Sequence, residues 1–176
     1  MASTHNAAVT ELLAREEIRQ LPYRYSAAVQ SRDVDAMVEL FSVQARFGKH
    51  GNGPDGLRRL MTDSLTDSVF AVILVANHLI EFDGDDAATG EVWAHCFAHT
   101  ANDGFVEQLI RYHDRYIRED GRWLFLHRRH RLWYGIGHAN SPLDQREANW
   151  PDRQIGVGDI PLTDPVFTKW WEARHR

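Results

Sequence analysis

Two side chains that could take part in chemistry stand at alternate positions of the segment WLFLHRRHRLWYG, residues 123–135. Because successive strand residues point to opposite faces, Arg128 and His130 would lie on the same face. An arginine among leucines could stabilise an enolate, phenolate or carboxylate, and an imidazole could move a proton near neutral pH. The alternatives are an ion pair with Asp114 and a core histidine bonded to the backbone or to Tyr112. The whole face would contain Leu124, Leu126, Arg128, His130, Leu132 and Tyr134.

The elements that must position these side chains begin with helices. Apolar residues recur at helical spacing between Val9 and Gln30, and Pro22 is expected to kink or divide that helix. Asp33 can cap a second helix, and Pro54 can open a third. The first third of the chain is therefore predicted to be mostly helical.

From Ser68 the pattern changes to strands. Four segments, VFAVILVANHLIEF, TGEVWAHCFAH, FVEQLIRYHDRYI and RWLFLHRRHRLWYG, are separated by the turn sequences DGDD, ANDG and REDG. Helices followed by a hairpin-linked sheet predict an α+β domain with a strongly curved antiparallel sheet packed on three N-terminal helices. Residues 1–135 would form this domain. Residues 136–176 would form an irregular, Trp-containing tail that packs on the domain or on a neighbouring subunit.

Composition and charge exclude several classes of partner and cofactor. The chain has 176 residues and a net charge of −5, so no basic field would attract nucleic acid or an anionic membrane. A single cysteine and an N-terminus without a secretory pattern make the cytoplasm the expected location. His95 and His99 share a strand face, but no set of ligands has zinc spacing, and no phosphate-binding glycine loop is present. We therefore expect no metal and no cofactor.

Three segments, in order, resemble the successive blocks of SnoaL-like proteins of the nuclear transport factor 2-like superfamily. They are EEIRQLPYRYSAAVQSRDVDAMVELFSVQARF, ANHLIEFDGDDAATGEVW and IRYHDRYIREDGRWLF, and the resemblance covers residues 10–134. It implies a cone-shaped α+β barrel that encloses a pocket. The branch with scytalone dehydratase, bile acid 7α-dehydratase and hexachlorocyclohexane dehydrochlorinase is the most similar.

This branch implies a polar residue on the first helix, an Asp five residues later, a His on the first long strand and an Arg on the last. When the blocks are matched in order, Tyr25 stands at the position of the polar residue on the first helix, and Arg128 stands at the position of the Arg on the last strand. Gln30 stands at the Asp position and Ile73 at the His position. Because neither side chain can ionise, the His–Asp general base of the branch is missing.

We expect three residues to be catalytic: the resemblance implies Tyr25 and Arg128, and His130 is added because it shares the strand face of Arg128. Arg128 would hold developing negative charge, Tyr25 would donate a proton or hydrogen bond, and His130 would move the proton; for Tyr25 the alternative is core packing. Cys96 has no activating signature and is expected to be a small core residue. The mainly apolar lining would comprise Gln30, Phe47, Ile73, Asn77, Cys96, Ile110, Tyr112 and Leu132.

These observations together predict a small-molecule enzyme without a cofactor. It would be a lyase, isomerase or cyclase acting on a hydrophobic, oxygenated ligand, in a homo-oligomer that is a dimer or trimer. The residues at 30 and 73 favour the alternative, a non-catalytic ligand-binding or assembly protein with the same fold. A third alternative is an accessory subunit of a ring-hydroxylating oxygenase.

Overall fold

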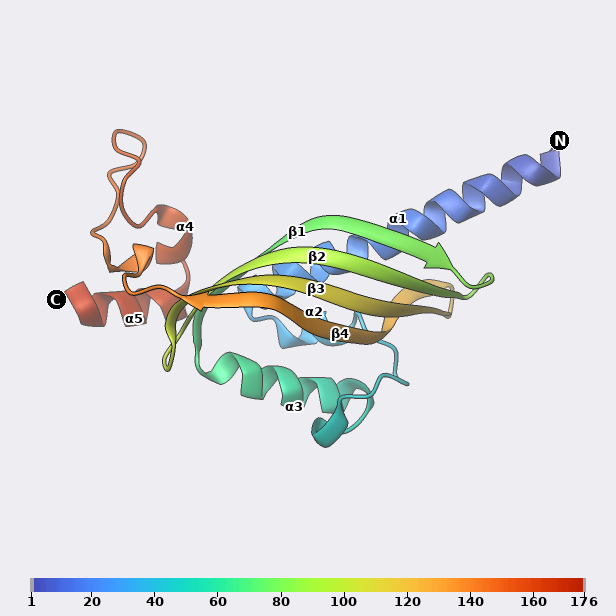
Figure 1. Ribbon diagram of the computed structural model, residues 1–176, viewed down its shortest axis with the longest axis horizontal. Helices are drawn as coiled ribbons and strands as arrows, with labels where there is room; N and C mark the ends of the chain where they lie inside the picture. The colour runs from blue at the N-terminus through green and yellow to red at the C-terminus, as the bar shows by residue number, and fades with distance from the viewer. Residues whose placement is uncertain (1, 176) are drawn as a thin grey trace.

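The computed structural model describes residues 2–175 and has helices followed by an antiparallel sheet (Figure 1). The helices are α1 (Ala2–Ser31), α2 (Val34–Val38) and α3 (Gly53–Thr66), with a 3₁₀ helix at Gly48–His50. The strands are β1 (Ser68–Phe82), β2 (Ala87–Thr100), β3 (Gly104–Glu119) and β4 (Arg122–Gly137), and they lie in the order β1-β2-β3-β4. The predicted α+β class, with three N-terminal helices on a curved four-stranded sheet, is confirmed.

The helix boundaries follow from capping residues. Asp33 accepts a hydrogen bond from the backbone N–H of Ala36 at 2.9 Å and so caps α2, and Pro54 lies in the first turn of α3. The expectation that Pro22 could divide the first helix is wrong, because α1 continues through it. The ring of Pro22 is fully buried, and this burial offsets the backbone hydrogen bond that a proline cannot make.

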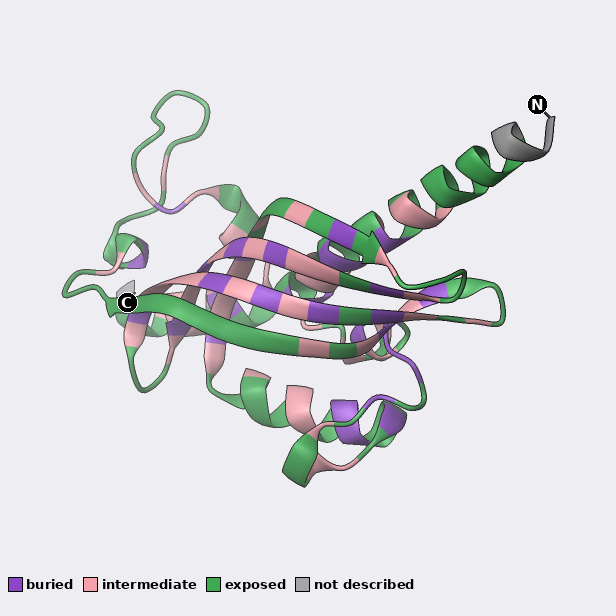
Figure 2. Cartoon of the chain, turned by 45° about the vertical axis from the view of Figure 1, so that its right-hand side comes forward, coloured by how far each residue is buried: buried purple, intermediate pink, exposed green. Residues whose placement is uncertain are grey.

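The inner face of the sheet is lined by small side chains at its centre. Ala94 and Cys96 of β2 are buried, and Ala94 pairs with Ile110 of β3. Two positions further along β3, Tyr112 is also buried. The alternation of buried and more exposed residues runs along β2 and β3 in Figure 2, as expected for strands with one face on a core.

The alternation predicted for β4 is broken by two bulges. The one between Leu132 and Tyr134 turns Tyr134 to the outer face, where its hydroxyl donates to Glu107, so its expected inward position is wrong. The other lies nearer the start of the strand. Arg115 pairs with His127, but Tyr116 pairs with Phe125, so Leu126 is an extra residue. As a result Phe125 and Arg128 both lie on the inner side. The expected inward positions of Leu124 and Leu126 are therefore wrong, and Trp123 and Phe125 are buried in their place.

Backbone pairing explains why this strand bulges. Phe125 donates its N–H to the carbonyl of Leu40 at 2.8 Å and accepts from the N–H of Ser42 at 2.9 Å. The segment after α2 therefore holds Phe125 from the other edge of β4. The Phe125 ring then packs 5.0 Å from the Phe41 ring, centroid to centroid.

The C-terminal residues pack on the far end of the sheet. They contain a 3₁₀ helix at Pro142–Asp144 and the helices α4 (Asp159–Leu162) and α5 (Pro165–His175), seen at one end of the strands in Figure 1. Phe167 of α5 is almost fully buried, in a cluster with Val69, Phe105, Leu143 and Val157. Within residues 2–175, none of the helices combines the length and apolar character that crossing a membrane requires.

Candidate functional site

The arginine singled out in the sequence is half of an ion pair inside the cone. Arg128 donates from Nε to Asp114 Oδ1 at 3.0 Å and from Nη2 to Asp114 Oδ2 at 2.7 Å. The side chains of Arg128 and Asp114 are only 5% and 0% exposed. The alternative that the sequence left open, an internal pair with Asp114, is thus the arrangement observed. The positive charge of Arg128 is already neutralised within the protein.

Three aromatic rings surround the guanidinium. Its central carbon lies 4.8 Å from the ring centroid of Tyr25, 4.2 Å from that of Tyr112 and 4.3 Å from that of Phe125. Rings at this distance attract a cation through their electron-rich faces and also exclude water from it. Arg128 is therefore fixed in place, and it can act on a ligand chiefly by orienting the two tyrosines beside it.

A hydrogen-bonded chain extends from this ion pair to β1. Tyr116 donates its hydroxyl proton to Asp114 Oδ2 at 3.0 Å, and His78 Nε2 lies 3.0 Å from the same hydroxyl oxygen. Since the Tyr116 proton points to Asp114, His78 acts as the donor through Nε2–H. Its Nδ1 is buried and has no hydrogen-bond partner among the described residues.

Burial keeps His78 uncharged. It lowers the pKa of His78 from 6.5 to about 4; Arg128 and Arg19 lower it further, and Asp114 opposes them. Sequence reasoning missed both His78 and Tyr116. Tyr116 follows Tyr112 and Asp114 at two-residue spacing, so the alternation of β3 could have revealed it.

Simple strand alternation could not have revealed that His78 points into the cone. A register shift between Val75 and His78 sets its direction. The same shift leaves Asn77 exposed, so the structure does not bring this expected lining residue into the cone.

Two phenol groups at the centre of the cone remain without partners. No hydrogen bond joins the hydroxyl of Tyr25 or of Tyr112 to another described residue. Both hydroxyl oxygens keep some access to solvent. The two rings meet edge to face with their centroids 6.5 Å apart. Burial raises the pKa of Tyr25, although Arg128 opposes it, and burial likewise raises the pKa of Tyr112. Both groups are therefore protonated hydrogen-bond donors at neutral pH.

His130 stands at the open side of this pair. Its ring centroid lies 5.6 Å from that of Tyr112, and the residue is exposed, like the rest of the second half of the edge strand β4 (Figure 2). Partial burial lowers the pKa of His130 below 6.5, so its imidazole is neutral and can accept a proton at pH 7. Leu132, further along the strand, is half exposed.

The other expected lining residues are distributed over three places. Ile73, Cys96 and Ile110 are buried in the central core next to Tyr112. Burial raises the pKa of the Cys96 thiol to about 11, which leaves it unreactive. Phe47 packs in a second cluster, 5.6 Å from Phe41 between ring centroids. Gln30 is exposed at the end of α1 and does not point into the cone core.

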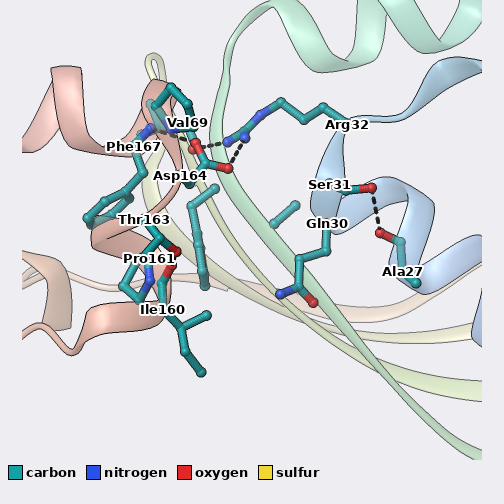
Figure 3. A pocket seen from close by; sticks show the side chains of 13 residues that line it. Ala27, Gln30, Ser31, Arg32, Val69, Ile160, Pro161, Thr163, Asp164 and Phe167 are labelled. Carbon is teal, nitrogen blue, oxygen red and sulfur yellow. Dashed lines mark hydrogen bonds and ion pairs between the residues drawn. The ribbon is translucent and has the colours of Figure 1, made fainter.

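Open volume lies beside the cone centre. A pocket of about 520 Å³ is bounded by the end of α1, the start of β1 and the helices α4 and α5, with Gln30 in its wall (Figure 3). A second pocket of about 500 Å³ lies across the outer face of the sheet. Tyr25, Arg128 and His130 line neither.

Two histidines of β2, His95 and His99, lie on the outer sheet face and contact neighbouring side chains. His95 Nε2 lies 2.9 Å from Glu107 Oε1, and the ring of His99 lies 4.5 Å from that of Trp170. In the part of the chain that the structure describes, no group of three or more His, Cys, Asp or Glu side chains is placed to hold a metal ion.

Comparison with known proteins agrees with the fold. The hexachlorocyclohexane dehydrochlorinase LinA type 2 has a TM-score of 0.70 at 20% identity, over 76% of this chain and 95% of that one. A protein named as a candidate scytalone dehydratase from Novosphingobium aromaticivorans has a TM-score of 0.66 at 16% identity, over 76% and 93%. Rv3472, a Mycobacterium tuberculosis protein of unknown function, has a TM-score of 0.59 at 21% identity, over 93% and 89%.

The family of this protein follows from comparing its sequence with models of protein families. No protein with a curated description is significantly similar to this chain. Residues 10–129, more than half of the chain, match the family model described as a SnoaL-like domain. This protein therefore belongs to the family of SnoaL-like domains.

Proposed function

We propose that this protein is a small-molecule enzyme of the lyase or isomerase type, and that Tyr25 and Tyr112 are its hydrogen-bond and proton donors. The observation that supports this most directly is the pair of unpartnered, protonated phenols beside the Arg128–Asp114 ion pair. Neither hydroxyl is held by another side chain and both keep access to solvent, so each is free to donate a hydrogen bond to a ligand oxygen. The substrate would be hydrophobic, because the rest of the cone core is apolar.

Loss of water from a cyclic β-hydroxy ketone shows how the groups would act. The ketone oxygen accepts a hydrogen bond from Tyr112. Neutral His130 takes a proton from the carbon atom that lies between the carbonyl carbon and the carbon bearing the hydroxyl group. The resulting enolate re-forms the carbonyl as the C–O bond to the β-hydroxyl breaks, while Tyr25 gives its proton to the departing hydroxyl. Water and an enone leave, and the proton on His130 returns to Tyr25 through solvent. Every proton donor and acceptor comes from the chain, so the step uses no cofactor.

The structural neighbours support this class of reaction by their names alone. One is called a dehydrochlorinase and another a candidate dehydratase, and both names describe eliminations. At the positions where the sequence resemblance implies a His–Asp base, this chain has Gln30 and Ile73. We therefore place the base at His130, at the exposed side of the phenols, and expect different substrates from those of the dehydrochlorinases.

The test is turnover of a set of cyclic β-hydroxy ketones, with scytalone as the first member and hexachlorocyclohexane for comparison. We expect mass spectrometry to show loss of water from at least one ketone, and no chloride release from the chlorinated compound. Tyr25→Phe and Tyr112→Phe should each lower kcat by about 100-fold with little change in KM. Tyr23→Phe is the matched control, since Tyr23 lies on the same helix but is exposed to solvent. Unchanged turnover in both cone variants would contradict the proposal.

A non-catalytic ligand-binding protein is the second candidate. The neutral residues at 30 and 73 and the neutralised charge of Arg128 favour it. In that case the ketones would bind to the wild-type protein, as seen by shifts of backbone NMR signals on β3 and β4, but no substrate would be converted between pH 5 and pH 9. Binding together with turnover would reject this candidate.

A further inference from the structure

The pocket of about 520 Å³ at the end of α1 is built by two parts of the chain that are far apart in sequence. Its floor is the start of β1, with Val69, Phe70 and Ala71, and its opposite wall is formed by α4 and the first turn of α5 (Figure 3). Ile160 and Phe167 face it from that wall. The volume lies within the range of sites that enclose small organic ligands, and most of the surface is apolar.

Most polar groups in this pocket already have partners. Ser31 donates its hydroxyl to the carbonyl of Ala27 at 3.0 Å, and Thr163 donates to the carbonyl of Ile160 at 2.7 Å. The amide of Gln30 has no hydrogen-bond partner among the described residues, and in Figure 3 it extends toward the α4 side of the pocket. Its NH₂ group and its carbonyl oxygen are therefore both free to form hydrogen bonds with a ligand.

An ion pair holds the wall in place. Arg32 Nη1 lies 2.5 Å from Asp164 Oδ2, and Nη2 of the same arginine donates to the carbonyl of Val69. Asp164 Oδ1 accepts from the backbone N–H groups of Val166 and Phe167, both at 2.9 Å, and so caps α5. A single carboxylate therefore joins the start of α5 to the end of α1.

We propose that this pocket is a binding site for a small, uncharged, mainly apolar molecule with one hydroxyl, carbonyl or amide group. Gln30 binds the polar group, and Arg32 with Asp164 keeps α4 and α5 in position as the wall. The ligand is uncharged because the two charged residues at the pocket neutralise each other. The site is separate from Tyr25 and Tyr112, and the inference does not depend on the proposed reaction.

The test uses 2-naphthol, a neutral aromatic molecule with one hydroxyl, and follows backbone NMR signals of the full-length protein. We expect saturable shifts at Phe70, Ala71 and Ile160. Ala27 lines the pocket from the exposed side of α1, so Ala27→Phe should fill it and weaken binding at least about 10-fold. Gln30→Leu should weaken binding about 3- to 10-fold through the lost hydrogen bond.

Control variants distinguish binding in this pocket from general effects of a substitution and from the proposed reaction. Ala8→Phe, at an exposed position of the same helix, should bind like the wild type, and so should Tyr25→Phe, which changes only the proposed reaction. Asp164→Asn should weaken binding and speed amide hydrogen exchange in α4 and α5. Shifts that map elsewhere, no shifts up to millimolar 2-naphthol, or unchanged affinity in Ala27→Phe would each overturn the proposal.

Discussion

Asp114 presents both of its carboxylate oxygens to Arg128, at 3.0 and 2.7 Å, at a place where neither side chain is more than 5% exposed. Removing one charge leaves the other buried without compensation, which typically costs about 3–5 kcal/mol. We expect Asp114→Asn to lower the free energy of unfolding by about that amount, measured by urea denaturation. The amide also becomes a weaker acceptor for the hydroxyl of Tyr116.

Two further variants show whether the cost comes from burial. The double variant Asp114→Leu with Arg128→Met should recover much of the loss, since an apolar pair of similar volume often matches a buried ion pair. Glu11→Gln removes the exposed pair of Glu11 with Arg15 and should cost less than about 1 kcal/mol. An Asp114→Asn protein no less stable than Glu11→Gln would show that the internal pair does not support the fold.

Strand periodicity predicted the fold and part of the site because most of the sheet is regular. Cys96 is buried as expected, and Ala94, two positions before it on β2, is buried with it. Sequence reasoning failed where the backbone inserts an extra residue. The bulge at Leu126 depends on contacts of Phe125 with a segment far earlier in the chain, at Leu40 and Ser42, and no local pattern encodes such contacts. The direction of His78 was missed for the same reason.

The bulge itself can be tested by deletion. With Leu126 deleted, Phe125 and Arg128 would stand two positions apart, so strict alternation would keep both on the inner face and only the extra residue would be lost. We therefore expect the deletion variant to keep cooperative thermal unfolding, followed by circular dichroism. Leu126→Ala keeps the backbone length and should lose only about 1–2 kcal/mol, since this side chain is only partly buried. Loss of cooperative unfolding in the deletion variant would contradict this expectation and would show that the fold requires the extra residue itself.

Gly90 leaves room for the hydrogen-bonded pair of His78 and Tyr116. A Cβ atom at this position would lie 2.9 Å from Tyr116 Cε2, closer than real contacts allow, and 3.0 Å from His78 Nε2, closer than most of them. Gly90→Ala should therefore lower the free energy of unfolding by about 1–3 kcal/mol, measured by urea denaturation. Gly137→Ala on β4 is the control, because no described atom lies within 4 Å of the place that its added methyl group would take. Equal stability of the two variants would contradict the tight contact.

The uncharged state of His78 makes stability depend on pH in a defined window. Its pKa is about 4 in the folded protein and 6.5 ordinarily, because burial opposes the charge. Between pH 6.5 and pH 4 the unfolded chain binds a proton at His78 and the folded protein does not. The contribution of neutral His78 to the free energy of unfolding is therefore complete above pH 6.5 and decreases as the pH falls toward 4. The slope is at most about 1.4 kcal/mol per pH unit, and below pH 4 both states are protonated and the slope ends. Urea denaturation of His78→Gln should show a shallower fall between pH 6.5 and 4 than the wild type. His127→Gln, at an exposed position of β4, should follow the wild type, and parallel curves for wild type and His78→Gln would contradict the assignment.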